Sequence, residues 1–385
     1  SISFLMFLIF ATYLLQIFFI AVLMGSVEAG AKLSWGVVGC GSVCEVKSLP
    51  SIYKHARCEI IALGRRNQDE LAKFALRHGL NDCALLSTGE AVIDHLAEHA
   101  KKHPEARVAC YVATPVSSHA PLAMYAASRS VACYLEKPMS RDAKEGADVI
   151  KTFTASGTPL FVAYYRRRLP KFVAVKAELP RCGTITSVRV TLLQKRHLMP
   201  EERRRHWHYD KEVSGGGLIM DLGSHIFDLL DHLLGPIEEV KGSAARACDT
   251  SPGGPDIEDV VVGTWRHSGN PPNRPILGSC QFNFASSENV DEIKITGTQG
   301  TITFVVFSDD PPVFSAATGD SEQIPFEAFG GVQEHVHGPL VDTVVRDLLD
   351  GTSSCPSTGE SALRTQHVLD SLLNGRTSWD VDYLN

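Results

Sequence analysis

Three polar side chains stand on an otherwise apolar predicted helix, residues 218–234. Asp221, His225 and Asp228 lie at i, i+4 and i+7, which places them on one face of the helix. A single histidine on an apolar helix is usually a buried core residue with satisfied hydrogen bonds. Three titratable groups along one stripe instead indicate that the stripe lines a cavity, because burying charge without partners is unfavourable. Gly215-Gly216-Gly217, just before the helix, would let backbone approach a cofactor or substrate closely.

Lys137 is the second candidate for chemistry. It lies in Glu136-Lys137-Pro138, directly after the apolar run 131–135. A lysine at the carboxyl end of a buried strand can bind a substrate oxygen and stabilise charge on it. The alternative is a surface lysine beside a turn.

A glycine turn follows the first apolar run, residues 35–38, and a helix is predicted from Ser42 toward Tyr53. In a dinucleotide site the first glycine permits the turn, the second admits the pyrophosphate, and free helix amides face the anion. Cys44 takes the place of the third glycine, where a small residue is tolerated. An ordinary strand-to-helix turn is the alternative, but the βαβ context favours a nucleotide. The predicted cofactor contacts are Gly39, Cys40, Gly41, Ser42 and Val43.

The end of the second apolar run, residues 58–63, bears on the choice of cofactor. NAD sites place an acidic residue there to bind the ribose hydroxyls, whereas this chain has Gly64 followed by Arg65 and Arg66. A missing carboxylate and an added guanidinium suit the extra phosphate of NADP. We therefore expect NADP in preference to NAD; the alternative is a pair of solvated arginines.

Apolar runs alternate with helical patterns through the first half of the chain, which predicts a doubly wound parallel sheet. The runs are residues 35–38, 58–63, 107–114, 131–135 and 159–163, and the helices are 67–78, 90–103, 119–128 and 142–154. The order places the glycine turn, Thr114-Pro115 and Glu136-Lys137-Pro138 at the carboxyl edge of the sheet, where ligands bind in such folds.

The second half changes in character. A β-like run at 184–194 precedes the helix 218–234, and further runs follow at 237–247, 260–265, 276–284, 292–296 and 301–306. This order predicts an α+β domain with an open, largely antiparallel sheet. We expect a Rossmann domain at 33–160, an α+β domain for substrate and oligomer contacts at 161–330, and C-terminal helices at 331–385.

Composition excludes some classes of protein. The net charge of −7 argues against nucleic-acid binding. The 10 cysteines form no Cys-x-x-Cys pair or zinc-like spacing, so we expect no metal site and a reducing, cytoplasmic location.

Residues 1–24 are apolar and uncharged, which allows a signal anchor, a cleaved signal peptide or a non-native upstream extension; we favour the extension. Membrane association is expected only if this segment is retained.

These motifs together resemble the glucose–fructose oxidoreductase and inositol dehydrogenase family, called Gfo/Idh/MocA. The matching pieces are Gly39-Cys40-Gly41, Ala113-Thr114-Pro115 with His119, Glu136-Lys137-Pro138, and Gly215-Gly216-Gly217 followed by Asp221, Gly223 and His225. The resemblance implies a Rossmann domain, an open-sheet domain, terminal helices that pack back on the Rossmann domain, and dimers or tetramers formed through the sheet face.

The resemblance also implies roles for single residues. Lys137 would be the catalytic lysine, His225 the proton acceptor, and Asp221 a substrate-binding or orienting partner. Thr114, Pro115, His119 and Glu136 would flank the cofactor, and Tyr164 would form part of the active-site wall. The basic, aromatic segment 203–209 would cover the substrate, or form a solvated loop. Further substrate contacts are expected at Arg168, Trp207 and His208.

The sequence therefore predicts an NADP-preferring oxidoreductase that exchanges a hydride with a secondary alcohol or carbonyl. By resemblance the substrate is a sugar, cyclic polyol or dihydrodiol. Two alternatives stay open: a glycosidase of the same fold that uses NAD transiently, and a catalytically silent nucleotide-binding scaffold or sensor.

Overall fold

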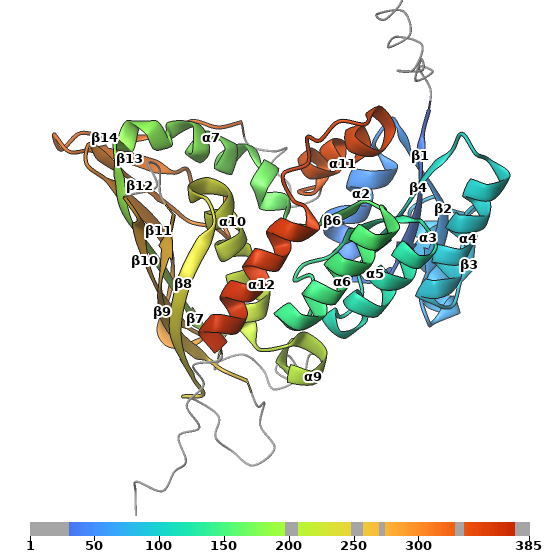
Figure 1. The fold of residues 1–385 in the computed structure, drawn as a ribbon, viewed down its shortest axis with the longest axis horizontal. Coiled ribbons are helices and arrows are strands. Elements are labelled where there is room, and N and C mark those ends of the chain that lie inside the picture. Colours follow the sequence, from blue (N-terminus) through green and yellow to red (C-terminus); the bar gives the residue numbers. More distant parts are fainter. Residues whose placement is uncertain (1–30, 197–206, 248–256, 269–273, 328–334, 374–385) are drawn as a thin grey trace, which may run out of the picture.

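The computed structural model describes residues 31–196, 207–247, 257–268, 274–327 and 335–373. The apolar segment 1–24 and the first part of the basic segment, 203–206, lie outside these ranges. Figure 1 shows two sheets with helices between them, one sheet in each half of the molecule.

The first sheet is parallel throughout, with strand order β3-β2-β1-β4-β5-β6, which confirms the predicted Rossmann-like architecture. Its strands are β1 Leu33–Val38, β2 Cys58–Gly64, β3 Ala84–Leu86, β4 Arg107–Val112, β5 Ala132–Leu135 and β6 Leu160–Val162. The helices between them are α2 Leu49–Tyr53, α3 Gln68–Arg77, α4 Gly89–Lys102, α5 His119–Ser128 and α6 Ala143–Ser156. β1 is buried along its whole length, as expected for a parallel strand covered on both faces.

The second sheet has the order β14-β13-β12-β11-β7-β10-β9-β8. Only β7 and β10 pair in parallel among its described neighbours, so the predicted open, largely antiparallel sheet is confirmed. The strands are β7 Ile185–Lys195, β8 Ile237–Ala245, β9 Val260–His267, β10 Ile276–Asn283, β11 Ala285–Gly297, β12 Gly300–Phe304, β13 Val313–Ala316 and β14 Ser321–Gln323.

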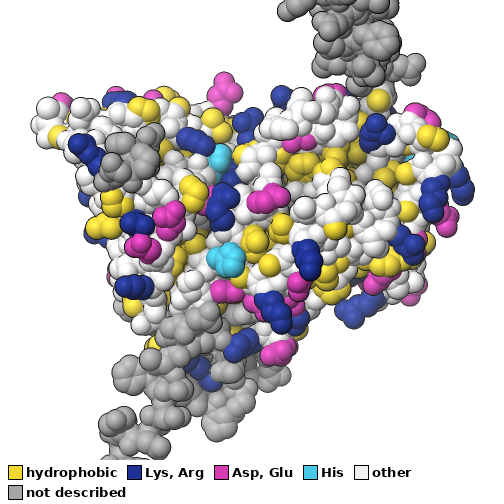
Figure 2. All heavy atoms as spheres, viewed as in Figure 1, with side chains coloured by type: hydrophobic (Ala, Val, Ile, Leu, Met, Phe, Trp, Pro, Cys, Tyr) yellow, Lys and Arg dark blue, Asp and Glu magenta, His cyan; other side chains and the backbone are white. Residues whose placement is uncertain are grey.

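The described helices cover one face of this second sheet. α7 Pro170–Glu178, α10 Ser224–Leu234 and α12 Gly359–Leu373 contribute Phe172, Phe227 and Leu369 to one core with the inward side chains of the strands. The opposite face carries exposed residues, including Leu277, which keeps 61% of its surface. Lysines and arginines are interspersed with acidic side chains over the face of the molecule drawn in Figure 2.

The two C-terminal helices take different positions. α11 Gly338–Asp350 buries Leu340, Val341 and Val344 in the Rossmann core that contains Trp35. α12 runs between the halves of the molecule (Figure 1), where Leu369 packs in the core of the second sheet and Ala362 in the Rossmann core.

The helix expected at 218–234 differs from the prediction. Residues Ile219–Gly223 form a π turn that leads directly into α10. A π turn inserts an extra residue into the helical repeat, so side chains before it are rotated relative to those after it. Asp221 therefore does not share the regular i, i+4, i+7 stripe with His225 and Asp228.

Candidate active site

Gly39 holds the first turn of the site. Its φ is +89°, and a Cβ at this position would lie 2.5 Å from the carbonyl oxygen of Ala113. Only glycine fits this backbone beside the loop after β4. The sequence therefore needs Gly39 to bring the ends of β1 and β4 together.

The neighbouring residues fit a dinucleotide. A Cβ at Gly41 would meet no heavy atom within 4 Å, and Ser42 and Val43 are exposed. The hydroxyl of Thr114, at the facing loop, is buried and has no hydrogen-bond partner among the described residues. Arg65 Nη1 donates to the carbonyl oxygen of Cys40 at 3.2 Å, which places its guanidinium against the glycine turn. Free space at Gly41, an unsatisfied hydroxyl and a cation suit a phosphate-bearing cofactor.

His119 joins two of the loops. Its Nδ1 lies 2.8 Å from the carbonyl oxygen of Pro138 and its Nε2 lies 2.9 Å from that of Thr114, and the residue is 1% exposed. Burial lowers the pKa of this imidazole, so the ring is neutral and donates to one carbonyl at a time. His119 thereby links the loop that contains Pro115 to the loop that contains Lys137 through its ring nitrogens.

Glu136 lies beneath Lys137 in a buried polar network. Its Oε1 accepts from the hydroxyl of Tyr111 at 2.6 Å, and its Oε2 accepts from the amide of Lys137 at 3.1 Å. His337, which stands at the start of α11, lies 3.7 Å from Glu136 Oε1 and accepts from or donates to the hydroxyl of Tyr134 at 2.9 Å. Burial raises the pKa of Glu136 against the opposing effect of the Tyr111 hydrogen bond.

Lys137 and Asp221 form the central contact. Lys137 Nζ lies 2.5 Å from Asp221 Oδ1 and 3.2 Å from the Asp221 carbonyl oxygen. Burial alone would raise the pKa of Asp221, but the charges of Lys137 and His208 bring it down to about 2. The ammonium and carboxylate side chains keep 13% and 30% of their surface, so the pair stays accessible to a small molecule.

His225 is held by a different partner. Its Nδ1 lies 3.3 Å from Nη1 of Arg166, and its ring makes edge contacts with Tyr164 and Tyr165 at centroid distances of 6.4 and 5.6 Å. An arginine can only donate, so Nδ1 accepts and the proton of the neutral ring sits on Nε2. Burial and then the charges of Arg166 and Lys137 hold the pKa of His225 well below its usual range.

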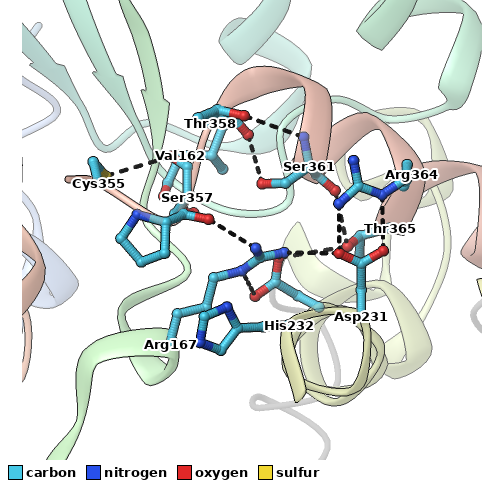
Figure 3. Close-up of polar contacts among 12 residues, drawn as sticks. Val162, Arg167, Asp231, His232, Cys355, Ser357, Thr358, Ser361, Arg364 and Thr365 are labelled. Carbon is cyan, nitrogen blue, oxygen red and sulfur yellow. Dashed lines mark hydrogen bonds and ion pairs between the residues drawn. The ribbon is translucent and has the colours of Figure 1, made fainter. Parts of the chain in front are cut away.

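A buried ionic network fixes helix α10, which carries His225 (Figure 3). Arg167 donates through Nε and Nη2 to the two carboxylate oxygens of Asp228 at 2.8 and 2.7 Å, and through Nη1 to the carbonyl oxygen of Pro356 at 2.8 Å. Arg364 of α12 donates through Nε and Nη2 to the two carboxylate oxygens of Asp231, at 2.8 and 2.7 Å. The network ties the segment after β6, helix α10 and helix α12 together.

One prediction about this helix was wrong. Asp228 does not line a cavity with His225, because it is 1% exposed and its carboxylate binds Arg167. The glycines before the helix allow close contacts with other parts of the chain. A Cβ at Gly215 would lie 2.3 Å from the Arg141 carbonyl oxygen, and one at Gly217 would lie 2.9 Å from that of Glu258.

The remaining predicted substrate residues are spread around the site. Tyr164 packs against His225, and the charge of His208, whose ring stacks on Trp207 at 3.7 Å, acts on Asp221. Arg168 is not joined to His225 or Asp221 by a described contact; its charge acts on His232, further along α10. Arg66 is exposed, with no described contact to the glycine turn.

Three residues of the site were not predicted from the sequence. Arg166 contacts His225, Lys47 adds charge around Asp221 and His225, and His337 lies beside Glu136. The run Arg166-Arg167-Arg168 after an apolar strand was the available signal, because such a cluster beside a core requires acidic or ligand partners. The described residues hold no group of three or more His, Cys, Asp or Glu placed to bind a metal.

Comparison with known proteins agrees with this geometry. The family model described as "Oxidoreductase family, NAD-binding Rossmann fold" matches residues 33–164, and the "GFO/IDH/MocA C-terminal domain" model matches 179–303. Oxidoreductase P35 of Formosa agariphila is 30% identical over 343 residues, covering 88% of this chain and 98% of the relative.

Two further relatives have named activities. Trans-1,2-dihydrobenzene-1,2-diol dehydrogenase of Mus musculus is 28% identical, over 70% of this chain and 73% of the relative. A levoglucosan dehydrogenase, solved in complex with NADH and levoglucosan, has the same fold with a TM-score of 0.75 at 21% identity, over 89% of this chain and 97% of that one. The chain belongs to the Gfo/Idh/MocA family of oxidoreductases and is an NAD(P)-dependent dehydrogenase with an NAD-binding Rossmann domain.

Proposed function

We propose that this chain is an NADP(H)-preferring oxidoreductase that exchanges a hydride with a secondary alcohol or carbonyl of a sugar, cyclic polyol or dihydrodiol. The observation that carries the proposal is the Lys137–Asp221 pair, which joins the carboxyl edge of the Rossmann sheet to the segment that leads into His225. The named activities of the dihydrodiol and levoglucosan dehydrogenases support the substrate class.

Lys137 is proposed to bind the reacting oxygen. Bound NADP would supply the hydride acceptor at its nicotinamide ring. The Lys137 ammonium would stabilise negative charge on the substrate oxygen as the carbon gives up its hydride. Asp221 would hold Nζ in place, or bind a neighbouring hydroxyl of the substrate. Glu136 and His119 position the loop that carries Lys137.

His225 is proposed to exchange the hydroxyl proton with the substrate. A neutral imidazole has one in-plane lone pair, and in this structure that lone pair, on Nδ1, faces Arg166. The ring can donate from Nε2 in this arrangement, and it can accept a proton only after the Arg166 contact is released. Proton uptake therefore requires a rearrangement around Arg166 when substrate binds.

Arg65 is proposed to select NADP. It directly follows β2, no carboxylate stands at that strand end, and its guanidinium reaches the glycine turn. A guanidinium at this position suits a 2′-phosphate, whereas an acidic residue would suit the ribose hydroxyls of NAD. Gly39, Cys40, Gly41, Ser42, Val43, Thr114 and Pro115 would complete the cofactor contacts, together with Arg66.

The open face of the second sheet is proposed to form a homo-oligomer. It carries a hollow of about 720 Å³ lined by residues that include Arg189, Lys241, Trp265 and Leu277, none of which belongs to the site of Lys137. Exposed Leu277 and Val262 on this face favour a protein contact over catalysis. We expect no nucleic-acid partner, because the chain has a net charge of −7.

The cytoplasm is the proposed compartment. The cysteines of the described residues are all free thiols, as in a reducing environment. No helix within the described ranges is both long and apolar enough to cross a membrane.

A turnover screen tests the function. Incubating the protein with NADP and a panel of sugars, polyols and dihydrodiols should produce absorbance at the reduced-nicotinamide band with at least one substrate. Cleavage of a glycoside with no net change of cofactor would instead identify the glycosidase alternative. A folded protein that binds cofactor but turns over no substrate would support the scaffold or sensor.

A further inference from the structure

Arg166 is a cation buried beside the proposed catalytic histidine. The residue is 8% exposed, and its Cζ lies 4.9 Å from the centroid of the Phe307 ring. Nη1 donates to the hydroxyl of Tyr165 at 2.6 Å and contacts Nδ1 of His225 at 3.3 Å, while Nε donates to the carbonyl oxygen of Val306 at 3.4 Å. Every one of these acceptors is neutral, and Nη2 makes none of the described hydrogen bonds.

The adjacent Arg167 has the carboxylate partners that Arg166 lacks among the described residues. Arg167 is also buried, but its guanidinium faces the carboxylates of Asp228 and Asp231. Arg166 has no such ion pair among the described residues. Asp291 also contacts the backbone of Val306. Its carboxylate accepts from the amides of Val306 and Phe307, at 2.9 and 2.7 Å.

Burying a charge without a counter-ion is unfavourable, so buried arginines are normally paired. The strongest charges that act on His225 are positive, those of Arg166, Lys137 and Lys47. Lys137 is neutralised by Asp221, whereas buried Arg166 has no ion pair among the described residues. A guanidinium fork of this kind matches the geometry of a carboxylate or phosphate.

We propose that the substrate is a sugar-like molecule carrying an anionic group, a carboxylate or a phosphate, and that Arg166 binds this group and thereby releases Nδ1 of His225. The inference rests on the proposed function and names its substrate class. When Arg166 turns to the anion, the lone pair on His225 becomes available, and neutralising the cation favours protonation of the ring. Only a substrate with the anionic group would then prepare His225 for proton transfer.

Matched ligands test the recognition step. Calorimetric titration of the NADP-loaded protein compares D-glucose with D-glucuronate and D-glucose 6-phosphate, and D-galactose with D-galacturonate and D-galactose 6-phosphate. We expect at least one charged ligand to bind about tenfold or more tightly than its neutral parent, the effect of one charge-assisted contact. The tighter of the two charged forms identifies carboxylate or phosphate. Arg166→Gln should remove the difference, and Arg129→Gln, a matched loss of one exposed arginine, should keep it.

Histidine NMR on the unmodified protein tests the second step without a variant that might fail to fold. The ring nitrogens of His225 should report a neutral ring with its proton on Nε2 in the free protein. The tighter charged ligand should change the tautomer or raise the pKa of His225, and its neutral parent should leave both unchanged.

Equal binding of charged and neutral ligands, no binding of the charged ones, or an unchanged His225 signal would each overturn the inference. Oxidation of neutral polyols with NADP would leave the proposed function standing in that case. If the unmodified protein bound no NADPH, or turned over no substrate at all, the result would count against the proposed function itself.

Discussion

Lys137 Nζ and Asp221 Oδ1 lie 2.5 Å apart, although 84 residues separate the two in the chain. Lys137 follows strand β5 of the Rossmann sheet, and Asp221 lies in the π turn before helix α10. The contact therefore connects the carboxyl edge of the Rossmann sheet to the helix that carries His225.

Removal of the ammonium should slow the reaction and spare cofactor binding. We expect Lys137→Met to lower kcat by about 10²–10³-fold, the effect of losing one group that stabilises developing charge. NADPH titration followed by fluorescence should give a Kd close to that of the unmodified protein. Lys144→Met, an exposed lysine on α6, serves as the matched control. A Lys137→Met enzyme with an unchanged kcat would show that the lysine has no part in the chemistry.

The same pair should make stability depend on pH at the acid end. The pKa of Asp221 falls from 3.8 to about 2 in the folded protein, so the unfolded chain binds more protons in this range. This stabilisation is fully present above about pH 4 and is lost as the pH falls through 2. Between pH 6 and pH 3 the unmodified protein should lose roughly 1 kcal/mol more than Lys137→Met, measured by urea unfolding at both values. Parallel losses in the two proteins would refute the assignment.

The Arg167 network should dominate the local stability of α10. Arg167→Met leaves the carboxylates of Asp228 and Asp231, at 1% and 3% exposure, with less compensation, and should lower the free energy of unfolding by about 3–5 kcal/mol. Arg364→Met should have a smaller effect, because the Arg364 side chain keeps 41% of its surface. Denaturant titration of both variants gives the comparison. If both variants lost the same free energy of unfolding, the burial of Arg167 would not explain how strongly the network stabilises the protein.

Cofactor preference should depend on Arg65. Arg65→Gln removes the cation beside the glycine turn, so NADPH affinity should fall about tenfold or more while NADH affinity changes little. Lys73→Gln, an exposed cation on α3, is the control for loss of charge. Fluorescence titration with both nucleotides measures the ratio. A protein that prefers NADH before substitution would contradict the role given to Arg65.

The fold was largely predictable because most of its strands are strongly apolar or alternate clearly, including short β5 and β6. The exceptions are short or weakly patterned: β3 has three half-exposed or exposed residues, and all three residues of β14 are exposed, so neither showed alternation. β13, of four residues, and α7, of nine, were also missed. The pattern around α7 was obscured by the preceding arginines.

The site was predictable only in part. Residue type and strand-end position pointed to Lys137, and helix spacing pointed to Asp221 and His225. The π turn was invisible in the sequence, so the partner of each acidic residue was not predictable: Asp221 turned out to contact Lys137, and Asp228 to contact Arg167. Arg166 could not be distinguished from its two neighbours until the chain was folded.

The most direct measurement of the central claim separates binding from turnover at His225. His225→Asn keeps a polar side chain of similar reach but removes proton exchange near neutral pH. With a substrate found in the screen, we predict that NADPH binds with a Kd within about threefold of the unmodified value while kcat falls by about 10²–10⁴-fold. A variant that retains kcat, or one that loses NADPH binding, would contradict a catalytic role and identify His225 as a structural residue.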